Sequence, residues 1–201
     1  MSNRILQLAR QGLLCSAVGL SLGAEAPRLG FQTLGSWPTG SMKSQFTAGS
    51  GYGAGAFAEW ELDAGRALRL AYDGVYYPTV HEASAWPSLP GLTGGESDQK
   101  CRSHSVTLQY LYFPRNDTEG FYFLVGLGGM AQTRKTETSL RPVSGPALDL
   151  TTLQETGVKL ACVAGLGYEF SRSWGVTARY SFITVENHTL GAVQAGISYR
   201  F

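Results

Sequence analysis

Residues 192–201, AVQAGISYRF, alternate between apolar side chains and side chains that are polar or small. Val193, Ile197 and Tyr199 fall on one face of this segment, while Gln194 and Arg200 fall on the other. A period of two residues predicts a β-strand with one apolar and one polar face. Residues 158–170, VKLACVAGLGYEF, keep the alternation for longer than most strands of soluble sheets.

The same alternation recurs throughout the chain after residue 26. It predicts eight strands, at about 27–36, 52–62, 68–76, 105–112, 120–133, 158–170, 174–182 and 192–201. The fifth segment is apolar at consecutive positions from Phe121 to Val125, so its pattern does not decide which face points inward. No run of 18 apolar residues occurs after residue 26, so a membrane-spanning helix is not expected there.

The connections between these segments are of two kinds. Those at 63–66, 114–119 and 171–173 are short, and so is the last one, near 186–189. Those at 37–50, 78–103 and 134–153 are long, polar and rich in Gly, Pro, Ser and Thr. Short turns at one end and long loops at the other are typical of membrane barrels. We therefore predict an all-β fold: an eight-stranded antiparallel up-and-down transmembrane β-barrel with long extracellular loops.

A soluble β-sandwich or a lipocalin-like barrel is the alternative, because its strands alternate in the same way with the apolar face inward. That fold would leave charged residues such as Glu59, Lys159 and Arg179 outside and pack many tyrosines within. The two alternatives differ in which face of each strand points outward.

Aromatic residues support the membrane alternative. On the predicted outward face, the residue nearest each short turn or the C-terminus is aromatic: Trp60, Tyr112, Phe121, Phe170, Trp174 and Phe201. Aromatic rings of this kind collect at the boundary between hydrocarbon and water, so this set predicts one girdle. Trp37, Tyr76, Tyr77 and Phe182 are candidates for the opposite belt.

Composition excludes several classes of function. The chain carries 16 basic and 15 acidic residues, and this near-neutral balance argues against a nucleic-acid partner. Aromatic residues make up 11% of the chain, which argues against intrinsic disorder. Cys101 falls in a predicted loop and Cys162 in a predicted strand, so we expect no disulfide. No Cys/His spacing typical of a metal site is present, and we expect no cofactor.

Residues 1–24 have the features of a signal peptide. Arg4 and Arg10 precede a short apolar stretch, and small residues follow it. Cleavage after Ala24 or after Ala26 fits the small-residue pattern, leaving residues 27–201 as the barrel domain. An ordinary N-terminal amphipathic helix is the alternative.

The terminal Tyr199-Arg200-Phe201, the leader and the eight-strand pattern together resemble the small Gram-negative outer-membrane β-barrels of the OmpA/OmpX type, the outer-membrane β-barrel domain family. The resemblance covers the chain after the leader and implies a location in the bacterial outer membrane. It also implies that Ile197, Tyr199 and Phe201 form the signal read by the barrel assembly machinery. It does not imply one activity, because the same fold serves several roles.

The predicted inward faces carry charged residues that would form an interior polar network: Glu59, Glu61, Arg69, Asp73, Lys159 and Arg179, with Glu169 and Arg200. An aligned turn at 63–66 would place Glu61 opposite Arg69 as an ion pair. Buried charges need partners, so the simplest interpretation is a satisfied polar plug. The alternative is a narrow gated pore for ions or small solutes, in which Glu59 exchanges between Lys159 and Arg179.

Catalytic and ligand-binding motifs are weak. Residues 126–131 match a dinucleotide-binding glycine pattern but no helix is expected to follow, so these glycines are interpreted as close-packing positions. His188 with Ser181 or Ser198 is the candidate set for a lipid A modifying enzyme. His81 and His104 share a predicted loop and are the candidate metal ligands.

The main prediction is a non-enzymatic, monomeric outer-membrane protein with a structural or surface-interaction role. Its expected partners are outer-membrane lipids and lipopolysaccharide, or an external molecule contacted by the loops. The basic residues Arg134, Lys135 and Arg141, beside the third loop, would suit lipopolysaccharide phosphates.

Overall fold

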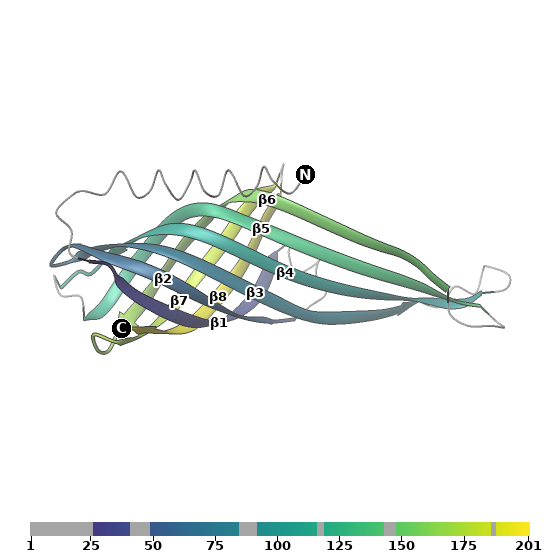
Figure 1. Cartoon of the computed structure of the whole chain (residues 1–201), viewed down its shortest axis with the longest axis horizontal. Coiled ribbons are helices and arrows are strands. Elements are labelled where there is room, and N and C mark those ends of the chain that lie inside the picture. The colour runs from purple at the N-terminus through teal and green to yellow at the C-terminus, as the bar shows by residue number, and fades with distance from the viewer. Residues whose placement is uncertain (1–25, 41–48, 85–91, 116–118, 143–147, 186–187) are drawn as a thin grey trace.

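The computed structural model describes residues 26–40, 49–84, 92–115, 119–142, 148–185 and 188–201. The predicted signal peptide lies outside them. The described residues form a closed barrel in which each strand pairs with its neighbours in chain order and the last strand returns to the first (Figure 1). The strands are β1 Arg28–Gly40, β2 Gly51–Asp63, β3 Arg66–Ser84, β4 Leu92–Tyr112, β5 Gly120–Pro142, β6 Leu148–Glu169, β7 Trp174–Val185 and β8 His188–Arg200. All eight pairings are antiparallel, so the predicted fold is confirmed.

The register of the strands sets the width of the barrel. Starting from Thr33 and following the paired residues in both directions leads to Tyr168 and to Val158, both on β6, and 168 − 158 = 10 residues. A stagger of this kind tilts the strands by roughly 35–45° to the barrel axis, and eight strands leave an interior that side chains fill.

The apolar faces point outward. Leu166 and Tyr110 are exposed on the outer surface, whereas Glu59 and Arg179 are buried inside the barrel. This orientation contradicts the soluble alternative, whose apolar faces would be inside. On β5, whose phase the sequence leaves open, Phe121, Phe123, Val125 and Leu127 are exposed and Tyr122 and Leu124 are buried.

Two of the three predicted long loops are largely wrong. β3 and β4 continue through residues 78–84 and 92–103, and β5 and β6 through 134–142 and 148–153. We call residues 78–84, 92–100, 135–142 and 148–157 the extension. It projects as a four-stranded sheet beyond the barrel (Figure 1). Residues 37–40 of the first predicted loop also continue β1.

The extension escaped the sequence-based prediction because it has no apolar face. Above the membrane both faces of a sheet contact water, so its strands need no period of two in hydrophobicity. Paired threonines such as Thr133 with Thr156 form the extension's base instead, and their hydroxyl oxygens lie 3.3 Å apart. β-Branched threonine favours strands even where its polarity resembles that of a loop.

Two apolar clusters lie inside the barrel. The upper cluster, next to the extension, comprises Leu34, Val75, Tyr77, Cys101, Met130, Ala161, Ile183 and Ala192. The lower cluster, toward the short turns, comprises Ala67, Leu111, Phe113, Tyr122, Leu124 and Val163. Cys101 and Cys162, the two cysteines within the described residues, are unpaired, as predicted, but Cys101 lies on β4 rather than in a loop.

Small residues allow the interior to pack closely. A Cβ atom at Gly128 would lie 1.9 Å from the Val106 carbonyl oxygen, and one at Gly126 would lie 2.7 Å from the Leu108 carbonyl oxygen. These two glycines are therefore close-packing positions, as predicted. Gly129 differs, because a Cβ there would meet nothing within 4 Å.

Candidate functional site

The first interior network lies toward the short turns and contains two carboxylates and two guanidinium groups. Arg69 Nη2 lies 2.6 Å from Glu59 Oε2 and 3.7 Å from Glu169 Oε1. Arg200 Nε lies 3.2 Å from Glu59 Oε1, and Arg200 Nη2 lies 2.5 Å from Glu169 Oε1. Each carboxylate is thus shared by both arginines, and the charges balance. All four side chains are at most 4% exposed, so neither water nor salt screens these contacts strongly.

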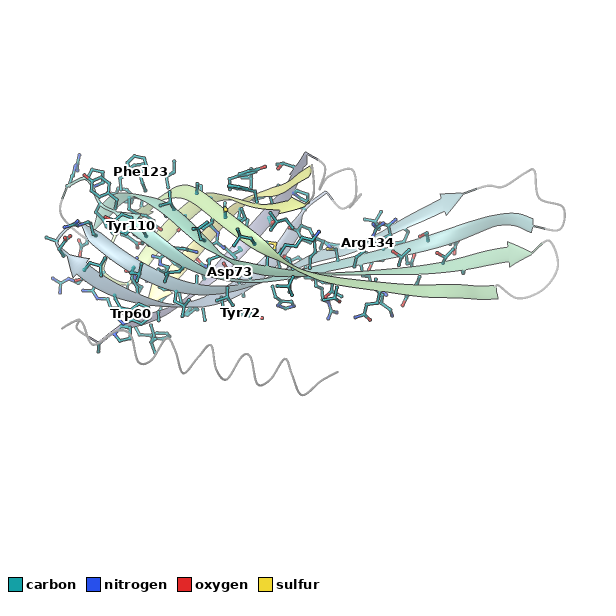
Figure 2. The ribbon with its side chains drawn as sticks, turned by 90° about the horizontal axis from the view of Figure 1, so that it is seen from above. Trp60, Tyr72, Asp73, Tyr110, Phe123 and Arg134 are labelled. Carbon is teal, nitrogen blue, oxygen red and sulfur yellow. The ribbon has the colours of Figure 1, made fainter. Side chains whose placement is uncertain are left out.

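The second network lies deeper along the axis, around Asp73, which Figure 2 shows within the barrel. Arg179 Nη2 donates to Asp73 Oδ2 at 2.6 Å, and Gln32 Nε2 donates to Asp73 Oδ1 at 2.5 Å. Gln194 Oε1 accepts from Arg179 Nε at 2.9 Å and from Ser181 Oγ at 3.1 Å. Five side chains from four strands, β1, β3, β7 and β8, therefore meet at this level.

Two predicted members of the interior network lie elsewhere. The predicted Glu61–Arg69 pair is wrong, because Arg69 is the cross-strand partner of Glu59 and the register shifts between Glu61 and Asp63. Glu61 Oε1 instead lies 2.7 Å from Arg28 Nη1 at the partly exposed rim. Lys159 is half-buried on β6 and makes no ion pair with the described part of the chain.

The contacts of the gated-pore alternative are not formed in this structure. Glu59 binds Arg69 and Arg200, whereas Arg179 binds Asp73. Above both networks, Tyr77 and the rest of the upper apolar cluster fill the axis. A cavity between this cluster and Gln194 has a volume of about 10 Å³, which is about the space of one water molecule.

The outer surface carries aromatic residues at the short-turn end. Tyr112, Phe121, Phe170, Trp174 and Phe201 are exposed there, and Trp60 is half-buried. Figure 2 shows Trp60 and Phe123 toward this end and Arg134 on the strands beyond the barrel. Ile197, Tyr199 and Phe201, the predicted assembly signal, all lie on the outer face, and the Tyr199 ring packs against Trp174 and Phe201. Their recognition by the assembly machinery stays a prediction.

The predicted opposite belt is wrong at one position. Trp37 is exposed and Tyr76 is half-buried on the outer surface, but Tyr77 points inward. Its hydroxyl lies 2.9 Å from Ser36 Oγ inside the barrel. Adjacent residues of a strand point to opposite faces, so Tyr76 and Tyr77 cannot share a belt.

An outer rim on β3 and β4 was not predicted from the sequence. The Arg102 guanidinium lies 5.6 Å from the centre of the Tyr76 ring. Nearer the short turns, on the same outer face, the Tyr72 hydroxyl lies 2.8 Å from His104 Nδ1. Continuing the alternation of Val106 and Leu108 backward by two residues at a time would have found His104 and Arg102 on the same outward face.

The described side chains among the residues considered for catalysis or metal binding are not brought together. Ser181 and Ser198 are buried inside the barrel, and the side chain of His188 lies outside the described residues. His81 Nδ1 contacts Asp98 Oδ1 at 2.6 Å, while His104 contacts Tyr72, so the two histidines have different partners. No cluster of three or more His, Cys, Asp or Glu side chains in the described ranges could hold a metal ion.

A groove of about 790 Å³ crosses the outer surface of β6, β7, β8 and β1. Small residues such as Gly35, Ala178 and Ala195 lie along it, with Tyr52 and Tyr168 at its sides. Its lining is largely apolar and lies on the same outer face as the exposed leucines. The groove is therefore a feature of the hydrocarbon-facing surface and not an aqueous pocket.

Comparison with known proteins agrees with this geometry. The family model described as outer membrane protein beta-barrel domain matches residues 13–201. The N-terminal β-barrel domain of OprF from Pseudomonas aeruginosa is similar in structure, with a TM-score of 0.57, 13% identity, and coverage of 89% of this chain and 99% of that chain. The Yersinia pestis attachment invasion locus protein Ail, in complex with the heparin analogue sucrose octasulfate, gives a TM-score of 0.55, 15% identity, and coverage of 87% and 97%. No curated protein matches this chain in sequence.

Proposed function

Because this chain belongs to the outer membrane protein beta-barrel domain family, we propose that it is a non-enzymatic protein that acts by contact at the bacterial surface. The protein is located in the bacterial outer membrane. The observation that carries the proposal is the extension, which places four strands outside a barrel whose interior is packed. We also propose that the barrel is a monomer inserted by the barrel assembly machinery.

The packed interior supports a role without solute transport. Ion pairs occupy two levels of the axis, and apolar side chains occupy the level above them. Breaking a buried ion pair is strongly unfavourable, and an apolar constriction also resists the entry of water and ions. The narrow-pore alternative therefore requires several layers to move together.

The extension supports a role in contact with another molecule. β6 begins to pair with β7 at Ala161 and β3 stops pairing with β2 at Tyr76, so the backbone beyond these points has one strand neighbour rather than two. Such an edge can accept a strand from another molecule. Pro78 and the register shift before Val80 interrupt the β3 edge. The β6 edge has a register shift between Asp149 and Thr151, and it is regular from residue 152 onward.

The experiment compares the full chain with a shortened variant. In this variant, residues 81–98 and residues 137–152 are each replaced by Asn-Gly. Val80 pairs with Gln99 and Thr136 with Leu153, so two-residue turns preserve both registers. Heat-dependent mobility on SDS gels should persist, because the barrel strands are intact.

We expect the full chain to produce no conductance steps in planar bilayers and to leave the mass of lipid A unchanged in expressing cells. It should increase adhesion of cells to at least one surface coated with heparin, collagen or purified lipopolysaccharide, and the shortened variant should lose that adhesion. Steady conductance steps, altered lipid A, or equal adhesion of both variants would contradict the proposal.

A further inference from the structure

The outer face of β4 changes from apolar to basic in one step. Val106 and Leu108 are exposed to 51% and 49% on the surface that faces hydrocarbon. The next outward residues on the side of the extension are His104, Arg102 and Lys100. The extracellular boundary of the hydrocarbon therefore lies close to His104, and the two cations lie just outside it.

Arg102 is the exposed cation of this rim. Its guanidinium lies above Tyr76, whose ring orients it along the outer wall. Among the side chains that the structure describes, no carboxylate lies within ion-pair distance of Arg102. Its positive charge is thus available to a ligand from the membrane side.

Two lysines stand next to Arg102 on the same face. Lys100 and Lys135 are direct cross-strand partners, an arrangement that is unfavourable for like charges. Both contact one carboxylate: Lys100 Nζ lies 3.3 Å from Glu137 Oε2, and Lys135 Nζ contacts Glu137 Oε1. One carboxylate cannot neutralise two ammonium groups, so the group of Lys100, Arg102 and Lys135 has a net positive charge.

The geometry points to a binding site for the phosphate groups of lipid A, formed by Lys100, Arg102 and Lys135 on the outer wall of β4 and β5. Phosphate oxygens accept charge-assisted hydrogen bonds from both guanidinium and ammonium groups. The acyl chains of the same lipid would lie against Val106 and Leu108 below. The site differs from the predicted one, because it faces the membrane and uses neither a loop nor Arg134, which bonds to Gln99.

This inference rests on the proposed function in one respect, the orientation of the extension toward the outside of the cell. The shortened variant retains Lys100, Arg102 and Lys135. Loss of adhesion with retained lipid A binding would therefore separate the two proposals, and so would the reverse result.

The test uses the folded full chain in a detergent with an uncharged headgroup. Native mass spectrometry counts bound lipid A carrying two phosphates, and the same lipid after enzymatic removal of both. The variant is the triple substitution K100Q/R102Q/K135Q. The matched control is R172Q, because Arg172 is also an exposed arginine but lies in a short turn at the opposite rim. Heat-dependent mobility verifies that each variant is folded.

We expect the triple variant to bind phosphorylated lipid A at least tenfold more weakly than the parent and R172Q to bind it equally. Dephosphorylated lipid A should bind weakly and equally to all three. Equal retention of phosphorylated lipid A by the parent and the triple variant would overturn the proposal. So would equal retention by the parent of the two lipid forms.

A further arm distinguishes a lipid from a soluble anion. Inorganic phosphate and sucrose octasulfate are added separately as competitors at equal concentration. Weak displacement of lipid A supports a site that needs both phosphate and acyl chains. Displacement at concentrations comparable to that of lipid A, lost in the triple variant, would assign the site to a soluble anion and overturn the lipid assignment.

Discussion

Arg200, the last residue of β8, binds Glu59 of β2 inside the barrel, with Arg200 Nε 3.2 Å from Glu59 Oε1. β1 lies between these two strands, so the contact spans the place where the chain closes on itself. The residues on either side of Arg200, Tyr199 and Phe201, face outward. One strand therefore joins the ionic interior to the aromatic girdle, and the lower network is complete only when the barrel is closed.

Removing Glu59 should destabilise the barrel strongly. Glu59→Ala leaves Arg69 and Arg200 buried with only Glu169 to share, and loss of one partner from a buried ion pair costs about 3–5 kcal/mol. Urea unfolding in detergent, followed by tryptophan fluorescence, measures the change in the free energy of unfolding. Glu61→Ala is the control, because the rim pair with Arg28 is partly exposed and is worth at most about 1 kcal/mol. Equal losses for the two variants would contradict this account.

The same Glu59 substitution should not open the barrel to ions. The upper apolar cluster lies beyond the lower network and contains Tyr77 and Met130, so it continues to block the axis. We expect Glu59→Ala to be silent in planar bilayers. The quadruple variant E59A/D73A/Y77A/M130A, which also breaks the second network and removes the bulk of the upper cluster, should conduct. Conductance steps from Glu59→Ala alone would show that the upper cluster is not the barrier.

Gly167→Ala should disrupt the packing of Tyr122. A Cβ atom at residue 167 would lie 2.3 Å from Tyr122 Cζ, and the Tyr122 hydroxyl is held 2.6 Å from Thr177 Oγ1. Overpacking of this kind costs about 1–3 kcal/mol. The control is Gly129→Ala, where a Cβ meets nothing within 4 Å and stability should be nearly unchanged. The midpoint of heat-dependent mobility measures both effects, and a neutral Gly167→Ala would contradict the packing described.

Glu137 should titrate below its ordinary range. Hydrogen bonds from Lys135 and Lys100 lower the pKa of its carboxyl group below 4.5. A lowered pKa means that the Glu137 contacts are present above pH 4.5 and are lost as the pH falls through the lower value. Carboxyl-carbon NMR of glutamate-labelled protein measures the midpoint, and Lys135→Gln should move it upward. A midpoint that Lys135→Gln leaves unchanged would contradict the pairing.

The sequence predicts strand faces well wherever one face meets hydrocarbon. On β8 the apolar and polar residues alternate because lipid contacts one side and the filled interior the other, so Ile197 and Ser198 differ in kind as well as in direction. For the same reason the sequence predicted correctly that two apolar residues face outward, Tyr110 and Leu166, and that two charged residues face inward, Glu59 and Arg179. Contact with lipid on one face and with the interior on the other therefore determines the type of residue at each consecutive position.

Other features depend on forces that alternation does not reveal. The extension lacks a constraint from hydrocarbon, so Lys100 and Lys135 resembled loop residues although they pair across two strands. The partner of Arg69 depends on the tight turn that pairs Asp63 with Arg66 and on the register shift beside it, which together move the opposing residue from Glu61 to Glu59. The outer rim at Arg102 was not predicted because the alternation stops near the membrane boundary, so the fourth strand was expected to begin at about residue 105.

Phe201 should affect assembly in cells more than stability of the finished barrel. Its side chain is 79% exposed on the outer surface, and only its backbone N–H, which donates to the Leu29 carbonyl oxygen at 3.0 Å, joins the sheet. Phe201→Ala keeps that backbone bond and the interior contacts of Arg200. We expect the purified variant to refold in detergent with a free energy of unfolding within about 0.5 kcal/mol of that of the parent, the usual range for a surface substitution. If Phe201 is part of the assembly signal, the amount of heat-modifiable protein in cell envelopes should fall several-fold.

Phe170→Ala removes another exposed girdle ring and serves as the control. Equal losses for the two variants would mean that Phe201 acts only as a membrane-facing aromatic residue.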